Sequence, residues 1–158
     1  MKAEFSEIAT DIVEDETAEN DSRRFLIFEI DKLSIGVSTD FVIEIITNHA
    51  ITRVPMLPGY IEGIINLRGQ IIPIVNIRRR MGKPTVEFND KMCIIVLNIE
   101  STYIGIIVDT VQQVVDINVK EISQVPVHNG QELINGMLSI GDGATLLFLD
   151  CQQLVHNF

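Results

Sequence analysis

From Phe25 onward, the chain alternates between short apolar segments and short polar breaks. The segments are rich in isoleucine and valine, and the breaks contain glycine, asparagine, aspartate and proline. Long helical periodicity is largely absent, whereas short runs of β-branched residues are typical of strands. The segments expected to form strands include FLIFEI, LSIGVST, VIEIIT, MCIIVLNI, YIGIIVD and VQQVVDI. Many short strands separated by turn residues predict an all-β sandwich or barrel.

This pattern of strands occurs twice in the chain. Residues 25–46 align with residues 94–115 at an offset of 69, and later segments continue the alignment at offsets of 71, 73 and 74. The offset changes only at loops, where insertions are tolerated. Each copy reads as five strands with short helical turns, which suits a small barrel. Because one copy alone would have a thin core, we predict two five-stranded barrels related by a pseudo-twofold axis, over about residues 25–87 and 88–158.

Residues 1–24 differ in composition from the rest of the chain. They hold eight acidic residues against Lys2, Arg23 and Arg24, which gives −5 of the total charge of −10. We therefore expect a solvated, mostly disordered acidic tail. The alternative is a short amphipathic helix that forms on a partner, because Phe5, Ile8 and Ile12 fall at roughly helical spacing.

The overall charge excludes some partners. A net charge of −10 does not suit a nucleic-acid binder, which needs an excess of lysine and arginine to neutralise phosphates. The only basic cluster, residues 78–80, is expected to be a solvated strand end. The acidic N-terminus has no apolar segment typical of a signal peptide, and no apolar run reaches transmembrane length. We therefore expect a cytoplasmic protein without membrane insertion.

No catalytic motif emerges from the sequence. Asp40 and Asp109 occupy equivalent positions in the two copies, as the two carboxylates of an aspartic protease do, but neither is followed by the hydroxyl residue and glycine of such a site. They are expected to end a strand and to cap the turn that follows. His49, His128 and His156 are not at metal-ligand spacing, and no HExxH, CxxC, Walker-type loop or GxSxG occurs. We expect no catalysis, no cofactor and no metal.

Two further features have simpler explanations than a site. Cys93 and Cys151 lie far apart in or just after apolar strands, so buried free thiols are expected in preference to a disulfide or a metal pair. The sequence at residues 141–143, Gly-Asp-Gly, resembles a phosphate loop. It aligns instead with the turn of the first copy at Arg68 and Gly69, so a hairpin turn is predicted.

The two copies differ in chemical character at two aligned positions. Arg68 has no basic counterpart in the second copy, and Glu44 corresponds to the neutral Gln113. Loss of both charges together would result from a partnership between Arg68 and Glu44, whose chemistry suits such a pair. The alternative is that both are ordinary surface charges. An exposed pair contributes at most about 1 kcal/mol to stability, so display of the arginine to a partner is the better explanation.

The strand that follows Arg68 is expected to close the first barrel. Gly69 permits a tight turn. Pro73 lacks an N–H and should therefore occupy an edge or bulge position. The apolar residues expected to face the core are Ile71, Ile72, Ile74 and Val75.

The stretch GIINLRGQIIPIVNIRRRMG, residues 63–82, resembles the signature of the CheW family of chemotaxis coupling proteins. The resemblance also covers IGIIVDTVQQVV and LINGMLSIGDGATLLFLD, and so spans about residues 24–155. Asn76 stands where the family more often has aspartate, and the acidic tail is longer than the family core needs. The resemblance implies two five-stranded, SH3-like barrels.

The same resemblance implies a scaffold without catalysis or cofactor. Its partners would be a CheA-type histidine kinase and the cytoplasmic tip of chemoreceptors, in arrays at the inner membrane. Arg68 would belong to the receptor-binding surface with Val42 and Gly63 nearby, and Glu44 would be the acidic partner of that arginine. The kinase would bind apolar strand edges of the first barrel, at residues that the sequence does not identify.

Two other functions remain open at this point. One is an adaptor of the same family in a different array, such as one that governs surface motility or development. The other is an enzyme with an unrecognised site. Binding to receptor fragments and kinase would separate these alternatives.

Overall fold

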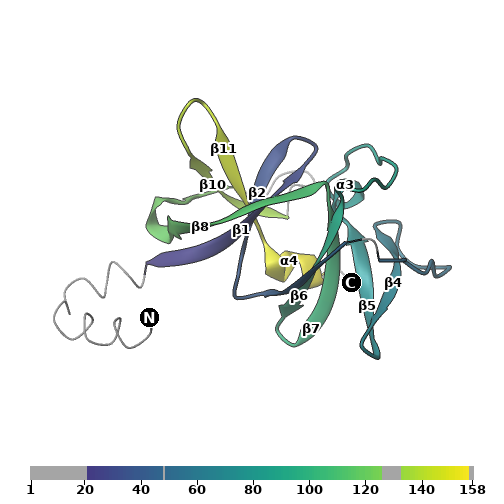
Figure 1. Ribbon diagram of the computed structural model, residues 1–158. Coiled ribbons are helices and arrows are strands. Elements are labelled where there is room, and N and C mark those ends of the chain that lie inside the picture. Colours follow the sequence, from purple (N-terminus) through teal and green to yellow (C-terminus); the bar gives the residue numbers. More distant parts are fainter. Residues whose placement is uncertain (1–20, 48, 126–132, 157–158) are drawn as a thin grey trace.

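The computed structural model describes residues 21–47, 49–125 and 133–156, which fold into two β-sheets with two short α-helices (Figure 1). The expectation of an all-β fold is confirmed. No helix in this described part is long and apolar enough to cross a membrane. The strands are β1 (Ser22–Ile30), β2 (Leu33–Ser38), β3 (Val42–Thr47), β4 (Ile61–Leu67), β5 (Gln70–Asn76), β6 (Cys93–Ile99), β7 (Thr102–Val108), β8 (Thr110–Asn118), β9 (Ser123–Gln124), β10 (Ile134–Ser139) and β11 (Thr145–Leu149). The helices are α3 (Ile77–Arg80), the 3-10 turn η1 (Val119–Glu121) and α4 (Cys151–His156).

Each sheet takes strands from both copies of the repeat. The six-stranded sheet has the order β8-β1-β2-β11-β10-β9, and the five-stranded sheet has the order β3-β6-β7-β5-β4. The first two strands of the two copies have therefore changed places. The predicted barrel boundaries at residues 25–87 and 88–158 are wrong for this reason. We name the barrel of residues 42–108 the middle barrel, and the barrel of residues 22–38 and 110–149 the terminal barrel.

The exchange preserves the predicted pseudo-twofold relation. Strands at the same position of the repeat have the same neighbours in the two sheets, so that β8-β1-β2-β11-β10 repeats the order β3-β6-β7-β5-β4. The aligned hairpin turns also agree, because Asp31 and Lys32 have φ values of 50° and 67°, as do Glu100 and Ser101. Positive φ at both central residues is typical of the two-residue turns that suit the twist of a hairpin.

Three apolar clusters hold the fold together. The largest contains residues of both sheets, among them Phe28 and Ile35 from one and Ile95 and Leu97 from the other, and it lies between the barrels. A second cluster fills the middle barrel and a third fills the terminal barrel. Burial of apolar side chains in all three supplies the main favourable free energy of folding.

The expectation for the N-terminal tail falls mostly on residues 1–20, which lie outside the described residues. The described chain begins just before β1, and Ser22 already pairs with Asn118 of β8. Residues 22–24, which the sequence analysis assigned to the tail, therefore belong to the sheet.

The basic cluster after β5 is not the solvated strand end that was expected. It forms α3, in which the Arg78 side chain is only 12% exposed. The Nε of Arg78 donates to Asp109 Oδ1 at 3.1 Å and its Nη2 donates to Oδ2 at 2.6 Å. Arg80 stacks on the ring of Tyr60, with its guanidinium carbon 4.9 Å from the ring centroid. Ion pairing and stacking, which a sequence pattern does not reveal, draw these arginines against the fold.

Asp109 therefore does more than cap a turn. It ends β7 as predicted, but its carboxylate accepts hydrogen bonds from Arg78 and, at 2.8 Å, from the backbone N–H of Asp31. Asp31 lies in the β1–β2 turn of the terminal barrel, whereas Arg78 lies in α3, directly after β5 of the middle barrel. This group of charges connects the two barrels.

The β4–β5 hairpin agrees with the sequence analysis except at Ile71. Ile72, Ile74 and Val75 are buried as expected, but Ile71 is 56% exposed. The parallel ladder between β5 and β7 begins at Ile74, so Pro73 lies just before it and no β7 residue needs its missing N–H.

Candidate partner-binding site

The turn that carries Arg68 has a constrained backbone. Arg68 has φ of +52° and Gly69 has φ of +86°, both in the left-handed region. The side chain of Asn66 stabilises the turn, because its Oδ1 accepts a hydrogen bond from the backbone N–H of Gly69 at 2.9 Å. Left-handed backbone is uncommon for a residue such as arginine, so the arginine is retained at a conformational cost.

The structure brings Arg68 and Glu44 into direct contact. The Nη1 of Arg68 donates to Glu44 Oε1 at 2.7 Å, and its Nη2 donates to Oε2 at 3.1 Å. This two-pronged arrangement is the one that the planar guanidinium favours. The arginine side chain is 70% exposed and the glutamate side chain 30%. The partnership inferred from comparison of the two copies is therefore present in the folded chain.

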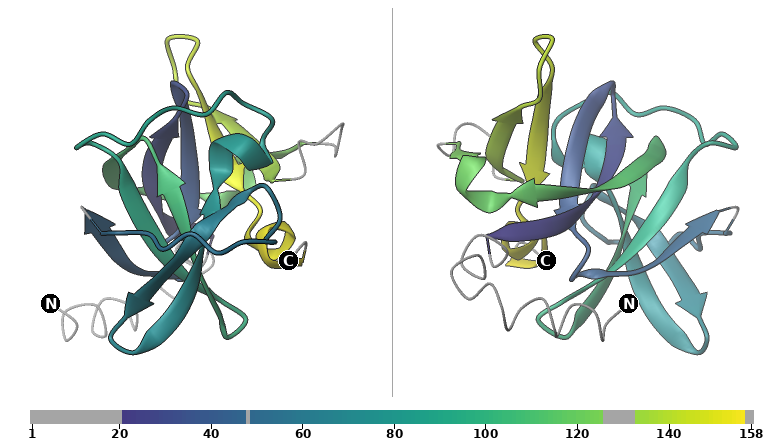
Figure 2. Two further views of the ribbon diagram at one scale, coloured as in Figure 1. Left: turned by 90° about the vertical axis from the view of Figure 1, so that its right-hand side faces the viewer. Right: turned by 60° about the vertical axis from the view of Figure 1, so that its left-hand side comes forward.

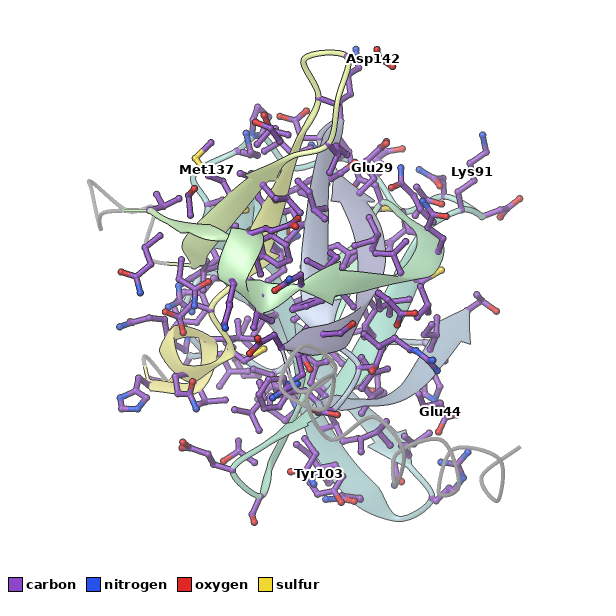
Figure 3. The ribbon with its side chains drawn as sticks, turned by 90° about the vertical axis from the view of Figure 1, so that its left-hand side faces the viewer. Glu29, Glu44, Lys91, Tyr103, Met137 and Asp142 are labelled. Carbon is purple, nitrogen blue, oxygen red and sulfur yellow. The ribbon has the colours of Figure 1, made fainter. Side chains whose placement is uncertain are left out.

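The ion pair spans the opening of the middle barrel. Glu44 lies on β3 and Arg68 follows β4, and these strands form the opposite edges of the five-stranded sheet. Figure 3 shows Glu44 at the side of the molecule, where its side chain is directed outward. The pair thus presents two charges at the surface where the two edges of the sheet approach each other.

The hydrogen bonds from Arg68 lower the pKa of Glu44 below its ordinary value of 4.5, and the same bonds raise the pKa of Arg68. Because the folded pKa of the glutamate is lowered, the pairing is fully present above about pH 4.5 and is lost as the pH falls through the lowered value. Carbon-13 NMR titration of the Glu44 carboxyl group measures this shift. In Arg68→Ala the pKa of Glu44 should return toward 4.5, and an unchanged pKa in that variant would contradict the pairing.

Val42 and Gly63 do not join the ion pair. Val42 is the first residue of β3 and packs against the core between the barrels, and the extra residue Ile43 lies in a bulge between Val42 and Glu44. Gly63 is buried in β4, five residues before Arg68, or about 16 Å along an extended strand. The four candidate residues therefore lie along two strands, and only Glu44 and Arg68 are in contact.

Gly63 has a clear structural role. Thr52 forms a β-bridge with Ile64 of β4. The N–H of Thr52 donates to the carbonyl of Ile64, and the N–H of Ile64 donates to the carbonyl of Thr52, each at 2.8 Å. A Cβ at Gly63 would overlap the carbonyl oxygen of Thr52 and would lie 2.8 Å from the side chain of Ile51. The close approach of the two backbones thus requires glycine at this position.

Gly63→Ala is expected to lower the free energy of unfolding by about 1–3 kcal/mol, because the Thr52 segment must move away from β4. Urea unfolding followed by circular dichroism measures the change. Gly59→Ala is the matched control, since a Cβ there meets no atom within 4 Å. Equal stability of the two variants would show that the Thr52 bridge adapts without cost.

Exposed apolar side chains lie on the strands that carry the pair. Ile43 and Ile45 on β3 are 48% and 41% exposed, and Ile71 lies on β5 opposite Asn66, beside the Arg68 turn. The sequence pattern did not reveal Ile43 and Ile45 as exposed and placed Ile71 in the core, because all three belong to apolar runs in which inward and outward positions look alike. Large exposed apolar side chains near a charged group are a common feature of protein interfaces.

Neither thiol forms a disulfide or belongs to a metal cluster among the described residues. Cys151 is buried, which raises the pKa of its thiol to about 12. Cys93 is half-buried, and desolvation also raises the pKa of its thiol. The arrangement offers no activated nucleophile at either cysteine.

The fold consists of two β-barrels that exchange their first two strands. Its charged turn lies beside exposed apolar side chains, and this combination defines a β-scaffold with a surface suited to binding other proteins. The family model described as the CheW-like domain matches residues 24–158. The chemotaxis protein CheW of Treponema pallidum is 32% identical over 148 residues, which cover 89% of this chain and 86% of that protein. The chain belongs to the CheW family, a family of non-catalytic chemotaxis adaptors.

Two further proteins are similar to this chain. The crystal structure of the scaffolding protein TtCheW from Thermoanaerobacter tengcongensis superposes with a TM-score of 0.74 at 28% identity, and covers 81% of this chain and 88% of that one. This match confirms the two SH3-like barrels. The protein FrzA of Myxococcus xanthus is 26% identical over 138 residues, which cover 85% of this chain and 86% of that protein.

Proposed function

We propose that this chain is a cytoplasmic adaptor that couples the signalling tips of chemoreceptors to a CheA-type histidine kinase in arrays at the inner membrane. The observation that carries the proposal is the match of the CheW-like domain to residues 24–158, together with the double barrel. Such an adaptor needs two separate surfaces, each of the modest size that reversible signalling contacts use.

We assign the receptor-binding surface to the neighbourhood of Arg68. The Arg68 side chain is 70% exposed and its guanidinium group is held by Glu44, so the orientation of that group is fixed before a partner binds. Val42 supports the start of β3, and Gly63 keeps the Thr52 segment against β4. In this proposal Arg68 provides the contact, whereas the other three residues position the strands around it.

We assign the kinase-binding surface to the edge of β3. In the described part of the chain β3 pairs only with β6, and its exposed Ile43 and Ile45 flank Glu44. The opposite edge, β4, is partly covered by the Thr52 bridge. An uncovered apolar edge strand is a template for association with another β-domain.

Reconstitution tests this function. Purified chain is mixed with receptor signalling fragments and the kinase, complexes are collected by sedimentation, and kinase autophosphorylation is measured. The adaptor should form ternary complexes and raise autophosphorylation. The proposal would be overturned if the kinase sedimented with the receptor fragments, and was activated, to the same extent with and without the chain.

The second candidate is an adaptor of a non-flagellar array, which the similarity to FrzA favours. Deletion of the gene distinguishes the two candidates. Loss of swimming chemotaxis with normal surface motility supports the first, and the reverse phenotype supports the second.

A further inference from the structure

The pseudo-twofold relation allows the two barrels to be compared at equivalent positions. Strand β3 corresponds to β8, and the β4–β5 hairpin corresponds to the β10–β11 hairpin. The turns of these two hairpins also correspond, because Arg68 and Gly69 have φ values of 52° and 86°, and Asp142 and Gly143 have 52° and 76°. The connections differ in length, because two residues lie between β4 and β5 and five lie between β10 and β11, so the two openings differ in the hairpin loop as well as in side chains.

In the middle barrel this opening is closed. Arg68 crosses from the hairpin turn to Glu44 on β3, and Leu67, just before the turn, packs against the apolar cluster inside the barrel. The ion pair thus lies over an apolar interior that is shielded from water.

In the terminal barrel the equivalent opening is not closed. The counterparts of Glu44 and Arg68 are Gln113 and Asp142, which are both exposed and do not bond to each other. The counterpart of Leu67 is Ile140, which is 53% exposed instead of packed inside. Figure 2 shows the β10–β11 hairpin extended beyond the neighbouring strands.

An apolar groove of about 380 Å³ occupies this opening. It lies between β8 and the β10–β11 hairpin, which Figure 3 shows with Asp142 at its tip. Its apolar lining comes from Ile27, Val115, Ile117, Leu138, Ile140 and Leu146. Several of these residues belong to the cluster inside the terminal barrel, so the groove is an access route to that core.

The charged groups at the groove are acidic. Asp116 and Glu121 line it, and Glu29 accepts a hydrogen bond from Gln112 at its margin. Arg24 pairs with Asp116 at 3.4 Å, but both side chains are about two-thirds exposed, so this contact is weak. A ligand with basic groups at its ends would meet favourable charge, and an acidic ligand would be repelled.

We propose that the open groove of the terminal barrel binds a short apolar segment, flanked by lysine or arginine, from a partner protein. Apolar side chains of the segment fill the space that Leu67 and the ion pair occupy in the middle barrel, and its basic residues face Asp116 and Glu121. Residues 1–20 of this chain, with seven acidic residues against Lys2 and so a charge of −6, and a second copy, with a charge of −10, have the wrong sign for this rim. The groove lies apart from Arg68, so this site is additional to the proposed receptor surface.

Peptide titration of the full chain tests the proposal without any receptor or kinase. The probe is acetyl-Lys-Lys-Leu-Ile-Val-Leu-Lys-Lys-amide, and its matched control carries glutamate in place of each lysine. Nitrogen-15 NMR should show shifts at Ile27, Gln113, Ile117 and Leu138. The lysine peptide should bind at least about tenfold more tightly at low salt, and this difference should shrink as salt is added.

Two variants locate the binding. Ile140→Lys places a cation at the mouth of the groove and should weaken the lysine peptide by about tenfold or more. Met137→Lys is the matched control on β10, the strand that directly precedes Ile140, since Met137 is exposed but does not line the groove and points away from β8 (Figure 3). That variant should bind as the wild type does.

Four outcomes would overturn the proposal. The first is equal affinity for the two peptides, and the second is an equal loss of peptide affinity in both variants. The third is a shift of the groove resonances when residues 1–20 are removed. The fourth is a shift of the groove resonances with protein concentration alone. The third outcome would assign the groove to the acidic tail, and the fourth would assign it to a second copy of the chain.

Discussion

Arg68→Glu should reduce receptor-dependent ternary complex at least tenfold, an effect of about 1.4 kcal/mol or more, and should weaken binding to the kinase alone much less. The substitution removes an exposed cation and places a second carboxylate beside Glu44, so the side chain at this position turns away from its present orientation. Fold stability should hardly change, because the pair is exposed and screened by solvent. Co-sedimentation and circular dichroism measure the two effects on the same preparation.

Two controls separate the possible causes of that loss. Lys91→Glu makes the same change of charge at an exposed residue outside the surface, and it should leave coupling intact. The double variant Glu44→Arg with Arg68→Glu restores a pair of reversed polarity. If the double variant again forms the receptor-dependent ternary complex, the ion pair only stabilises the barrel, and the assignment of Arg68 as the receptor contact is wrong.

Arg78→Ala should lower the free energy of unfolding by about 2–3 kcal/mol, the largest stability effect that we expect from a charged residue here. The Arg78 side chain is 12% exposed and that of its partner Asp109 is 22% exposed, so the loss leaves a partly buried carboxylate without its main donor. Because Arg78 also approaches Asp31 at 3.8 Å, the contact between the two barrels weakens as well. Urea unfolding at neutral pH measures the effect.

A double-mutant cycle with Asp109→Ala tests the cause. The two single variants and the double variant should have similar stabilities, because each single change already breaks the same pair. Arg78→Lys should recover only part of the loss, since lysine cannot donate two parallel hydrogen bonds. Additive effects would show that Arg78 stabilises the fold through other contacts.

The sequence was sufficient for the class of fold and for the residues that pair at the candidate site. The duplication predicted two barrels, and the charges present only in the first copy predicted the contact between Glu44 and Arg68. It was not sufficient for the assignment of strands to barrels. Both copies have the same apolar pattern, so β1 is equally suited to β3 and to β8, and nothing local decides between them.

Residues within apolar runs were also hard to place. Ile71 and Ile72 are adjacent and chemically identical, but one is 56% exposed and the other is fully buried. Strand alternation requires that one of them face outward, and the register that decides which one depends on the partner strand. The partners of Arg78 were missed for a related reason, because Asp31 and Asp109 lie 47 and 31 residues away along the chain.

The exchange of strands has a consequence for the order in which the chain can fold during synthesis. The middle barrel is continuous in sequence, so all five of its strands are available once residue 108 has been made. Strands β1 and β2 are made first, but β8, which pairs with β1, and β11, which pairs with β2, are made after the middle barrel. Ser22 of β1, for example, pairs with Asn118 of β8. The hairpin of β1 and β2 can form early, but the apolar edge of β1 that pairs with β8 stays unpaired until β8 has been made.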